Sequence, residues 1–242
     1  MRLSDAVRGH IDSLRLHRND GRFVPMPSAR PILARAKYQL LPAWSDYVAE
    51  VSTVDWAVSL ETASYLLWLI RRLKPTSLLD TGSGFSSYVF RRYQREEQES
   101  RVAVVSVDDS PEWLEATRTF LKNHQLSTDG VMSVVEFERL TDASFDFVFH
   151  DIASKELRVA MLPALLATAR PEAPIVVDDG QSQQVREGVR DAVRGTDRRY
   201  YSLRLYTLDE IERFALLLSP RAAAPPGAAM MVKQPPSRHE QR

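Results

Sequence analysis

The sequence of 242 residues contains no cysteine and no long apolar segment. Without cysteine the protein has no disulfides, no thiolate metal ligands and no cysteine nucleophile. No apolar run reaches the roughly 18 residues that a membrane-spanning helix needs. The N-terminal residues also lack the apolar core of a signal peptide. We therefore expect a cytoplasmic protein without a membrane partner.

An overall excess of charge of one sign is lacking too, because 32 Lys and Arg residues balance 32 Asp and Glu residues. The charges are unevenly placed: residues 1–37 and 219–242 are basic, whereas residues 38–218 are acidic. An acidic central region is a poor match for a polyanion. We expect no nucleic-acid partner, and we interpret the basic ends as solvated segments.

The first 54 residues have helical patterns with thin apolar faces. Apolar side chains recur at helical spacing over residues 1–20, and shorter helices are expected over 32–41 and 44–51. These faces are too thin to form a core alone. We therefore expect residues 1–54 to be a helical cap on the main domain, with a homodimer through this cap as a candidate arrangement.

From residue 55 onward the sequence alternates between strand and helix patterns. Ser59 is a good N-cap for a helix that Pro75 ends. Such alternation is typical of a parallel sheet covered by helices on both faces. The predicted strands cover residues 76–80, 102–107, 131–135, 145–150 and 174–178, and the predicted helices between them cover residues 86–98, 111–124, 156–169 and 182–194.

The pattern changes after residue 195. Two strand-like runs, Tyr200–Tyr206 and Arg213–Leu218, follow with no room for a crossover helix, so they should pair antiparallel. The predicted fold is α/β: a Rossmann-like, doubly wound, mostly parallel seven-stranded sheet with an antiparallel last strand. Residues 55–218 form the ligand-binding domain, and residues 219–242 are expected to be disordered.

The stretch Thr76–Tyr88 joins a buried strand to a helix through a glycine turn. In open parallel sheets ligands lie beyond the carboxyl ends of the strands, and this turn is the usual cradle. Gly82 and Gly84 permit backbone and ligand to approach closely. Asp108, after the second strand, could accept hydrogen bonds from the ribose of any adenosine ligand. A dinucleotide enzyme therefore stays open, although Ser87 meets the third position of the dinucleotide fingerprint only approximately.

Two motifs favour a different cofactor. Leu79–Gly84 and Val105–Asp108 resemble the first and second motifs of the class I S-adenosylmethionine-dependent methyltransferases, and the resemblance covers roughly residues 55–218. Asp80 would repel a pyrophosphate but attract an ammonium group, which agrees with this resemblance.

The resemblance implies a site for S-adenosylmethionine. In that family the residues matching Asp80, Gly82 and Gly84 surround the methionine part, and the residue matching Asp108 holds the ribose. Two further residues would lie beside the ribose and the adenine. The predicted cofactor-binding set is Ser59, Asp80, Gly82, Gly84, Ser86, Asp108, Asp109 and Trp113.

Acidic residues follow the next two predicted strands. Asp151 ends the fourth, and Asp178 and Asp179 end the fifth. Strand tips on one edge of a sheet converge, and three carboxylates without an Arg or Lys between them would raise one another's pKa. A divalent cation such as Mg²⁺ or Ca²⁺ would relieve that repulsion. Asp-Asp-Gly is also an ordinary turn sequence.

This arrangement is similar to the metal-dependent small-molecule O-methyltransferases of the catechol and macrolide-sugar kinds. The resemblance implies that Asp151, Asp178 and Asp179 bind Mg²⁺, which would hold two neighbouring substrate oxygens. Lys155 resembles the general base of the catechol kind, one position further from the acid than expected. Asp151 and His150 are the alternative bases, and a structural role is the other interpretation of His150.

The acceptor site is less defined by the sequence. The N-terminal cap and the segment Tyr206–Glu210 are expected to close over the pocket as lids. Tyr38, Tyr47 and Trp56 are candidates for an aromatic acceptor site, although core packing is favoured for each of them.

The sequence therefore predicts an S-adenosylmethionine-dependent methyltransferase that acts on the hydroxyl of a small molecule, with Mg²⁺ as a candidate second cofactor. A metal-independent N- or C-methyltransferase is the second hypothesis. A nicotinamide-dependent oxidoreductase and a non-catalytic adenosine-ligand binding module are the other two.

Overall fold

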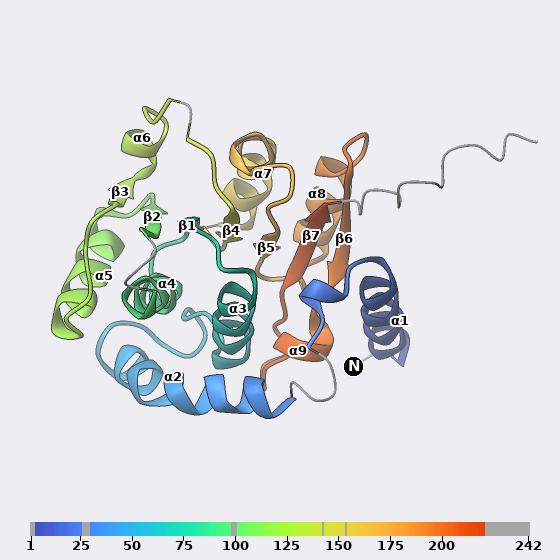
Figure 1. The fold of residues 1–242 in the computed structure, drawn as a ribbon, viewed down its shortest axis with the longest axis horizontal. Coiled ribbons are helices and arrows are strands. Elements are labelled where there is room, and N and C mark those ends of the chain that lie inside the picture. Colours follow the sequence, from blue (N-terminus) through green and yellow to red (C-terminus); the bar gives the residue numbers. More distant parts are fainter. Residues whose placement is uncertain (1–2, 26–29, 98–100, 142, 153, 221–242) are drawn as a thin grey trace, which may run out of the picture.

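A seven-stranded sheet forms the centre of the molecule (Figure 1). The computed structural model describes residues 3–25, 30–97, 101–141, 143–152 and 154–220. The strands are β1 Ser77–Thr81, β2 Ala103–Asp108, β3 Val131–Ser133, β4 Phe147–His150, β5 Ile175–Val177, β6 Arg198–Ser202 and β7 Leu216–Pro220. They lie in the order β3-β2-β1-β4-β5-β7-β6.

Helices connect and cover these strands. They are α1 Leu3–Asn19, α2 Arg30–Glu50, α3 Leu60–Leu73, α4 Phe85–Glu96, α5 Pro111–Asn123, α6 Val134–Phe137, α7 Lys155–Thr168, α8 Gln183–Ala192 and α9 Arg204–Thr207, with a short 3-10 helix at Gly21–Phe23. Ser59 caps α3 by accepting a hydrogen bond from the backbone N–H of Thr62, as the sequence predicts.

The strand directions confirm the predicted mixed sheet. β1 pairs in parallel with β2 and β4, and parallel pairing continues from β2 to β3 and from β4 to β5. β7 is antiparallel to both β5 and β6. Because β1, β2, β4 and β5 are parallel, their carboxyl ends lie at one edge of the sheet.

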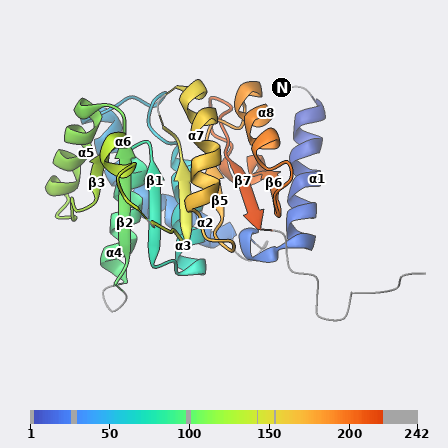
Figure 2. The same ribbon diagram turned by 90° about the horizontal axis from the view of Figure 1, so that it is seen from above.

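Side chains on the strands alternate between two apolar cores. Leu78 and Phe147 face the core beneath α3, α4 and α5, with α2 packed outside them. Leu79 and Val148 face the opposite core beneath α7 and α8. Figure 2 shows α7 and α8 together on one side of the sheet. The alternation follows from the period of two of a β-strand. Most residues within the strands are therefore buried in one core or the other, and the residues that directly follow the strands are the ones available at the carboxyl edge of the sheet.

α2 corrects the prediction of two short helices, because one helix runs through Pro42. Proline in a helix removes one backbone hydrogen bond and strains the preceding turn. Ala36, Leu40, Ala43 and Tyr47 recur at helical spacing and are all buried. This continuous apolar stripe packs α2 against α3, and its burial outweighs the cost of the proline.

The predicted strand Tyr200–Tyr206 is wrong in its second half. β6 ends at Ser202, and Arg204–Thr207 forms α9. The backbone N–H of Leu203 still donates to the carbonyl oxygen of Ala215 at 2.9 Å, so the chain leaves the sheet directly after that bond. The predicted antiparallel pairing of the two C-terminal runs is confirmed by β6 and β7.

The terminal segments lie at the margin of the sheet. α1 packs against β6 and α9 at the edge strand, away from β1. Ser219 and Pro220 belong to β7, and the rest of the predicted disordered tail lies outside the described residues. Within those residues no helix combines the length and the apolar character needed to cross a membrane.

Candidate functional site

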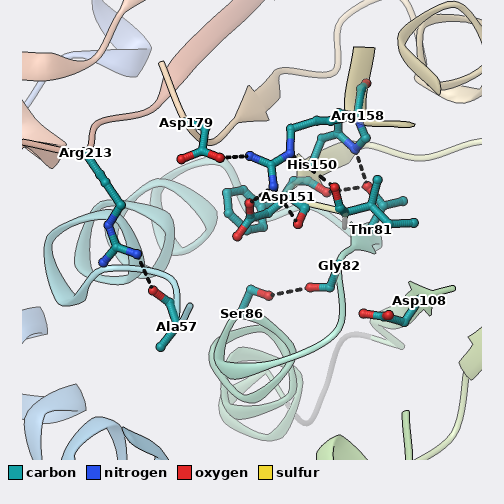
Figure 3. Close-up of polar contacts among 12 residues, drawn as sticks. Ala57, Thr81, Gly82, Ser86, Asp108, His150, Asp151, Arg158, Asp179 and Arg213 are labelled. Atoms are coloured by element: carbon teal, nitrogen blue, oxygen red, sulfur yellow. Dashed lines mark hydrogen bonds and ion pairs between the residues drawn. The ribbon is translucent and has the colours of Figure 1, made fainter. Parts of the chain in front are cut away.

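A cavity of about 810 Å³ opens at the carboxyl ends of the parallel strands. Its walls come from the glycine turn after β1, the tips of β2, β4 and β5, the start of α7, the segment 55–58 and Arg213. Figure 3 shows residues from most of these walls converging. The cavity therefore lies at the edge of the sheet where the sequence predicts a ligand site.

The glycine turn is fixed by sterics. Gly82 has φ +97°, which L side chains rarely adopt. A Cβ added there would lie 2.4 Å from the carbonyl oxygen of Asp151, so the turn packs directly on the tip of β4. The backbone N–H of Gly82 donates to the carbonyl oxygen of Val107 at 2.8 Å. At Gly84 a Cβ would lie 2.9 Å from the hydroxyl of Tyr47.

Asp108 organises the second wall. Its Oδ2 accepts hydrogen bonds from the backbone N–H of Ser83 at 2.7 Å and from the Ser83 hydroxyl at 3.1 Å. Its Oδ1 accepts from the backbone N–H of Ser110 at 3.0 Å. Burial raises the pKa of Asp108, against the lowering effect of these hydrogen bonds. The carboxylate thus holds the glycine turn and the start of α5 together while bordering the cavity.

Most of the predicted cofactor-binding set borders the cavity. Gly82, Gly84, Ser86, Asp108, Asp109 and Trp113 line it. Ser59 does not, because its hydroxyl is used inside α3, where it caps the helix and donates to the hydroxyl of Thr62 at 3.0 Å.

Asp80 also lies outside the cavity wall. It is fully buried, and its Oδ2 accepts from the hydroxyls of Ser87 at 2.5 Å and Ser106 at 3.0 Å. Burial raises the pKa of Asp80 to about 6. Arg91, also buried, donates to the Ser106 hydroxyl at 2.8 Å. This network joins β1, β2 and α4 through Oδ2, whereas Oδ1 of Asp80 is buried without a hydrogen-bond partner among the described residues. The predicted contact of Asp80 with a cofactor stays a prediction.

The three predicted metal ligands do converge, but a guanidinium lies between two of them. Arg158 Nη2 lies 2.7 Å from Asp151 Oδ1, and Nη1 lies 2.6 Å from Asp179 Oδ2 (Figure 3). Arg158 is 4% exposed. The expectation that no basic side chain separates these carboxylates is therefore wrong. Arg158 stands one turn into α7, and the helix turns it back over the strand tips.

The side chains do not fit a metal ion. Among the described residues, no group of three or more His, Cys, Asp or Glu side chains is arranged to hold one. The second oxygen of Asp179 accepts from the amide of Gln181 at 2.5 Å, so both of its oxygens are engaged. Asp178 joins neither ion pair of Arg158.

Asp178 borders the cavity and has spare hydrogen-bonding capacity. It is 5% exposed, and its Oδ1 is buried without a hydrogen-bond partner among the described residues. Burial raises the pKa of Asp178 to about 6, with a further contribution from the adjacent charge of Asp179. An unpaired buried acceptor costs about 1–3 kcal/mol, which a ligand that donates a hydrogen bond would recover.

His150 is a structural group. Its Nε2 donates to the carbonyl oxygen of Arg158 at 2.7 Å, and its Nδ1 lies 2.6 Å from Oγ1 of Thr81. A carbonyl oxygen only accepts, so Nε2 carries the proton and Nδ1 accepts from the hydroxyl. Burial lowers the pKa of His150 to about 3. The ring therefore stays neutral, with both nitrogens engaged, and the structural interpretation is the one that fits.

Lys155 lies at the rim of the cavity. It is the first residue of α7, exposed, and directly after the N-cap Ser154. A flexible exposed ammonium can reach over the mouth, but the described residues give it no fixed position. Its predicted role as a base stays a prediction.

The entrance is built from the segment 55–58 and Arg213, of which the sequence patterns predict only Trp56 as a candidate site residue. Arg213 donates to the carbonyl oxygens of Val54, Asp55 and Ala57 at 2.8–3.0 Å and pairs with Asp209 at 2.7 Å. The predicted lid Tyr206–Glu210 does not border the cavity.

The aromatic candidates separate into three different environments. Trp56 is 77% exposed at the entrance, and Tyr47 is 2% exposed with its hydroxyl over Gly84. Tyr38 is 79% exposed and does not border the cavity. The expected core packing is therefore wrong for Tyr38 and Trp56. Tyr206 lies elsewhere, within hydrogen-bonding distance of the hydroxyl of Ser13 at 2.5 Å and stacked on Tyr65.

The cavity is acidic. Seven carboxylates and three basic side chains of the described residues border it, and the turn Gly82–Ser86 has no basic side chain. Lys155, Arg158 and Arg213 all lie on the side of β4, β5 and the entrance. The half beside the glycine turn thus favours a positively charged ligand group over a pyrophosphate.

No protein-family model matches the sequence, and no curated protein matches it either. Solved structures do resemble it. The S-adenosylhomocysteine-bound methyltransferase PaMTH1 of Podospora anserina matches with TM-score 0.60 at 15% identity, over 82% of this chain and 98% of that chain. The O-methyltransferase TomG of Streptomyces achromogenes, involved in tomaymycin synthesis and solved with S-adenosylmethionine, matches with TM-score 0.55 at 19% identity, over 78% and 90%. An O-methyltransferase of Bacillus cereus with S-adenosylhomocysteine matches with TM-score 0.51 at 16% identity, over 89% and 99%. The chain therefore has the fold of the class I S-adenosylmethionine-dependent methyltransferases.

Proposed function

We propose that the protein is an S-adenosylmethionine-dependent methyltransferase that methylates a hydroxyl group of a small molecule. The observation that carries this proposal is the acidic cavity beside a glycine turn without basic side chains. S-adenosylmethionine has a sulfonium and an ammonium group, which such a wall attracts. A dinucleotide would place its pyrophosphate against the same carboxylates, which disfavours an oxidoreductase.

The residues at the carboxyl edge suit the parts of this cofactor. Asp108 would hold the ribose, because it is a buried carboxylate at the tip of β2 with oxygen lone pairs beyond those used by Ser83 and Ser110. Trp113 would pack against the adenine. Gly82 and Gly84 would leave room for the methionine part. The bound cofactor supplies a methyl group on a positively charged sulfur.

The rest of the site would orient the acceptor and take up its proton. Methyl transfer needs an acceptor oxygen in line with the methyl group, so positioning supplies much of the rate. Asp178, Asp151 and Lys155 are the candidates for receiving the hydroxyl proton. We do not assign this role to His150, because both of its ring nitrogens are engaged by Thr81 and by the carbonyl oxygen of Arg158.

O-methylation of a small molecule is supported by the solved neighbours described as O-methyltransferases. The Mg²⁺-assisted form of this reaction needs Asp151, Asp178 and Asp179 as oxygen ligands. Two of them are paired with Arg158 instead, so the proposed reaction uses no metal ion.

Calorimetry with S-adenosylmethionine, S-adenosylhomocysteine and NAD tests the cofactor. We expect micromolar or tighter binding of the two sulfur ligands and none of NAD. Binding of NAD alone would refute the proposal. A screen with isotopically labelled methyl donor over phenols, sugars, amines and carboxylic acids then identifies the acceptor. Transfer to amines alone would replace O- by N-methylation, and cofactor binding without any transfer would favour a non-catalytic binding module.

We also propose that residues 1–54 act as a cap on the binding domain of residues 55–218 and form a homodimer. Val7, Ile11 and Leu14 of α1 support this, because they are exposed at helical spacing. Sedimentation velocity of the wild type and of Leu14→Glu tests the dimer. A monomeric wild type would contradict it.

A further inference from the structure

We propose that Arg158 is the permanent cation of the acceptor site and takes the place in which a divalent metal ion would bind. This inference rests on the proposed function and deepens it. An acceptor oriented by protein groups alone needs one hydroxyl, whereas a metal-bound acceptor offers two neighbouring oxygens. The acceptor therefore needs only a single reactive hydroxyl, and a chelating pair of oxygens is not required.

The first argument is the position of the guanidinium. Its two terminal nitrogens bridge Asp151 and Asp179, which belong to different strand tips, at 2.7 and 2.6 Å. A metal ion shared by these carboxylates would have to occupy the same space, since metal–oxygen distances are only about 2.0–2.6 Å. Arginine does not lose its proton in proteins. A divalent ion would therefore meet a fixed positive charge.

The second argument is that the guanidinium is held on every side. Besides the two carboxylates, Nε donates to the carbonyl oxygen of Ile152 at 3.3 Å, and Nη2 donates to the carbonyl oxygen of Asp151 at 3.2 Å. The planar fork of arginine matches such a set of acceptors. Withdrawal of the side chain to admit a metal ion would break all of these bonds at once.

The third argument concerns the backbone that carries Arg158. Its N–H donates to the carbonyl oxygen of Ser154 at 2.9 Å in the first turn of α7, and its own carbonyl oxygen accepts from His150 at 2.7 Å. Figure 3 shows His150 beneath the ion pairs. His150 therefore acts as a positioning residue that ties α7 to the tip of β4. This contact gives a physical reason for a buried histidine whose ring has no access to the cavity.

The fourth argument concerns Asp178, the acid that Arg158 does not pair with. Asp178 takes no part in the ion pairs, and its Oδ1 has no partner among the described residues. With Arg158 compensating its two neighbours, Asp178 is left to accept a hydrogen bond from the single hydroxyl. Without the guanidinium, all three carboxylates should become available to bind a metal ion together.

Titration with MnCl₂, followed by calorimetry and by the electron paramagnetic resonance of free Mn²⁺, tests the inference on the intact chain. Wild type should bind Mn²⁺ weakly, and Arg158→Ala should bind it at least about tenfold more tightly, because the three carboxylates then lack their counter-charge. Arg158→Ala combined with Asp178→Asn should lose that gain. Arg186→Ala is the matched control, since Arg186 donates to the carbonyl oxygen of Gly180 at 2.7 Å and contacts none of the three acids. It should bind Mn²⁺ as weakly as wild type.

The inference is overturned if wild type already binds Mn²⁺ as tightly as Arg158→Ala, or if Arg158→Ala gains no more than Arg186→Ala. If Arg158→Ala does not fold, the wild type and Asp178→Asn decide the matter: Mn²⁺ binding by wild type that Asp178→Asn abolishes overturns it, and equally weak binding by both supports it. S-adenosylhomocysteine is titrated into the same samples. If S-adenosylhomocysteine does not bind, the proposed methyltransferase function is refuted. The Mn²⁺ titrations would still show whether Arg158 prevents a metal ion from binding.

Discussion

The two halves of the cavity are built in different ways. The half beside the glycine turn comes from residues 82–113, and its shape is set by the backbone: a positive φ at Gly82, a close approach at Gly84 and N–H donors to Asp108. The other half joins β4, β5, α7, the segment 55–58 and Arg213 through side-chain charges. A short sequence motif is enough to predict a shape that the backbone sets. A balance of side-chain charges depends on residues that are distant in sequence, so a short motif does not predict it.

The largest expected effect is on the backbone-defined half. Gly82→Ala should weaken S-adenosylhomocysteine binding at least about 100-fold, because the new Cβ would lie 2.4 Å from the carbonyl oxygen of Asp151 at φ +97°. Gly195→Ala is the matched control: it also has positive φ, +81°, but open space around the Cβ. It should lower the melting temperature without changing affinity. If both variants lose the same affinity for S-adenosylhomocysteine, the loss comes from backbone strain at positive φ and not from the close approach of Gly82 to Asp151.

Asp108→Ala should weaken S-adenosylhomocysteine binding by about 1–3 kcal/mol, roughly 10- to 100-fold, as expected for the loss of a charged hydrogen-bond partner. Asp109→Ala should change it less than threefold, because Asp109 is an exposed neighbour on the same wall. Calorimetry measures both. If the two variants lose equal affinity, the second wall acts through its charge and the ribose contact of Asp108 is not needed.

Asp178→Asn tests the charge-defined half through stability. Folding raises the pKa of Asp178 from its usual value near 3.8 to about 6. The folded protein therefore holds this proton more tightly than the unfolded chain. The resulting stabilisation is complete below about pH 4 and is lost as the pH rises through about 6. Asp151 and Asp179 oppose the ionised form, and Arg158 and Arg213 favour it.

Asp178→Asn should accordingly raise the free energy of unfolding by about 1–2 kcal/mol at pH 8 and by little at pH 4. Urea unfolding across this pH range measures the difference. Asp191→Asn, a change to an exposed acid of α8, should show no such trend. A variant that is less stable than wild type at pH 8 would mean that Asp178 has a favourable partner there.

The smallest expected effect is that of Tyr47→Phe, which changes a buried side chain beside the glycine turn. Burial raises the pKa of Tyr47 far above its usual value, with the charges of Asp108, Asp80 and Asp151 adding to the shift, so its hydroxyl stays protonated and can donate a hydrogen bond. Its loss should weaken S-adenosylhomocysteine binding about two- to tenfold, since one neutral hydrogen bond contributes about 0.5–1.5 kcal/mol. Tyr38→Phe, away from the cavity, should change nothing. An unchanged Tyr47→Phe would assign this side chain to packing on Phe120 alone.

The sequence patterns predict the sheet, the mixed strand directions and the glycine turn, because each depends on short-range signals: strand–helix alternation, caps such as Ser59, and glycines after β1. They also place Asp108, Asp151, Asp178 and Asp179 correctly at strand tips. The predicted helix boundaries are wrong where tertiary packing determines whether a helix continues. Pro42 does not end α2 because the buried stripe around it continues.

The charge balance of the acceptor half was not predictable in the same way. Arg158 lies within an amphipathic helix, seven residues after Asp151, and nothing in its local pattern shows that it turns towards the strand tips. Because no basic residue is adjacent to these acids in sequence, the pattern predicts a metal site. The position of Arg213 over the segment 55–58 depends on a contact between distant parts of the chain, which no short-range pattern predicts.

That contact has a consequence for folding kinetics. The carbonyl oxygens of Val54, Asp55 and Ala57 are bound by a guanidinium 156 to 159 residues further along the chain. Contacts of such sequence separation require the largest loop closure and tend to form late. The mouth of the cavity can therefore be completed only once Arg213 has been synthesised, and a nascent chain that ends before Arg213 would lack these contacts at the entrance.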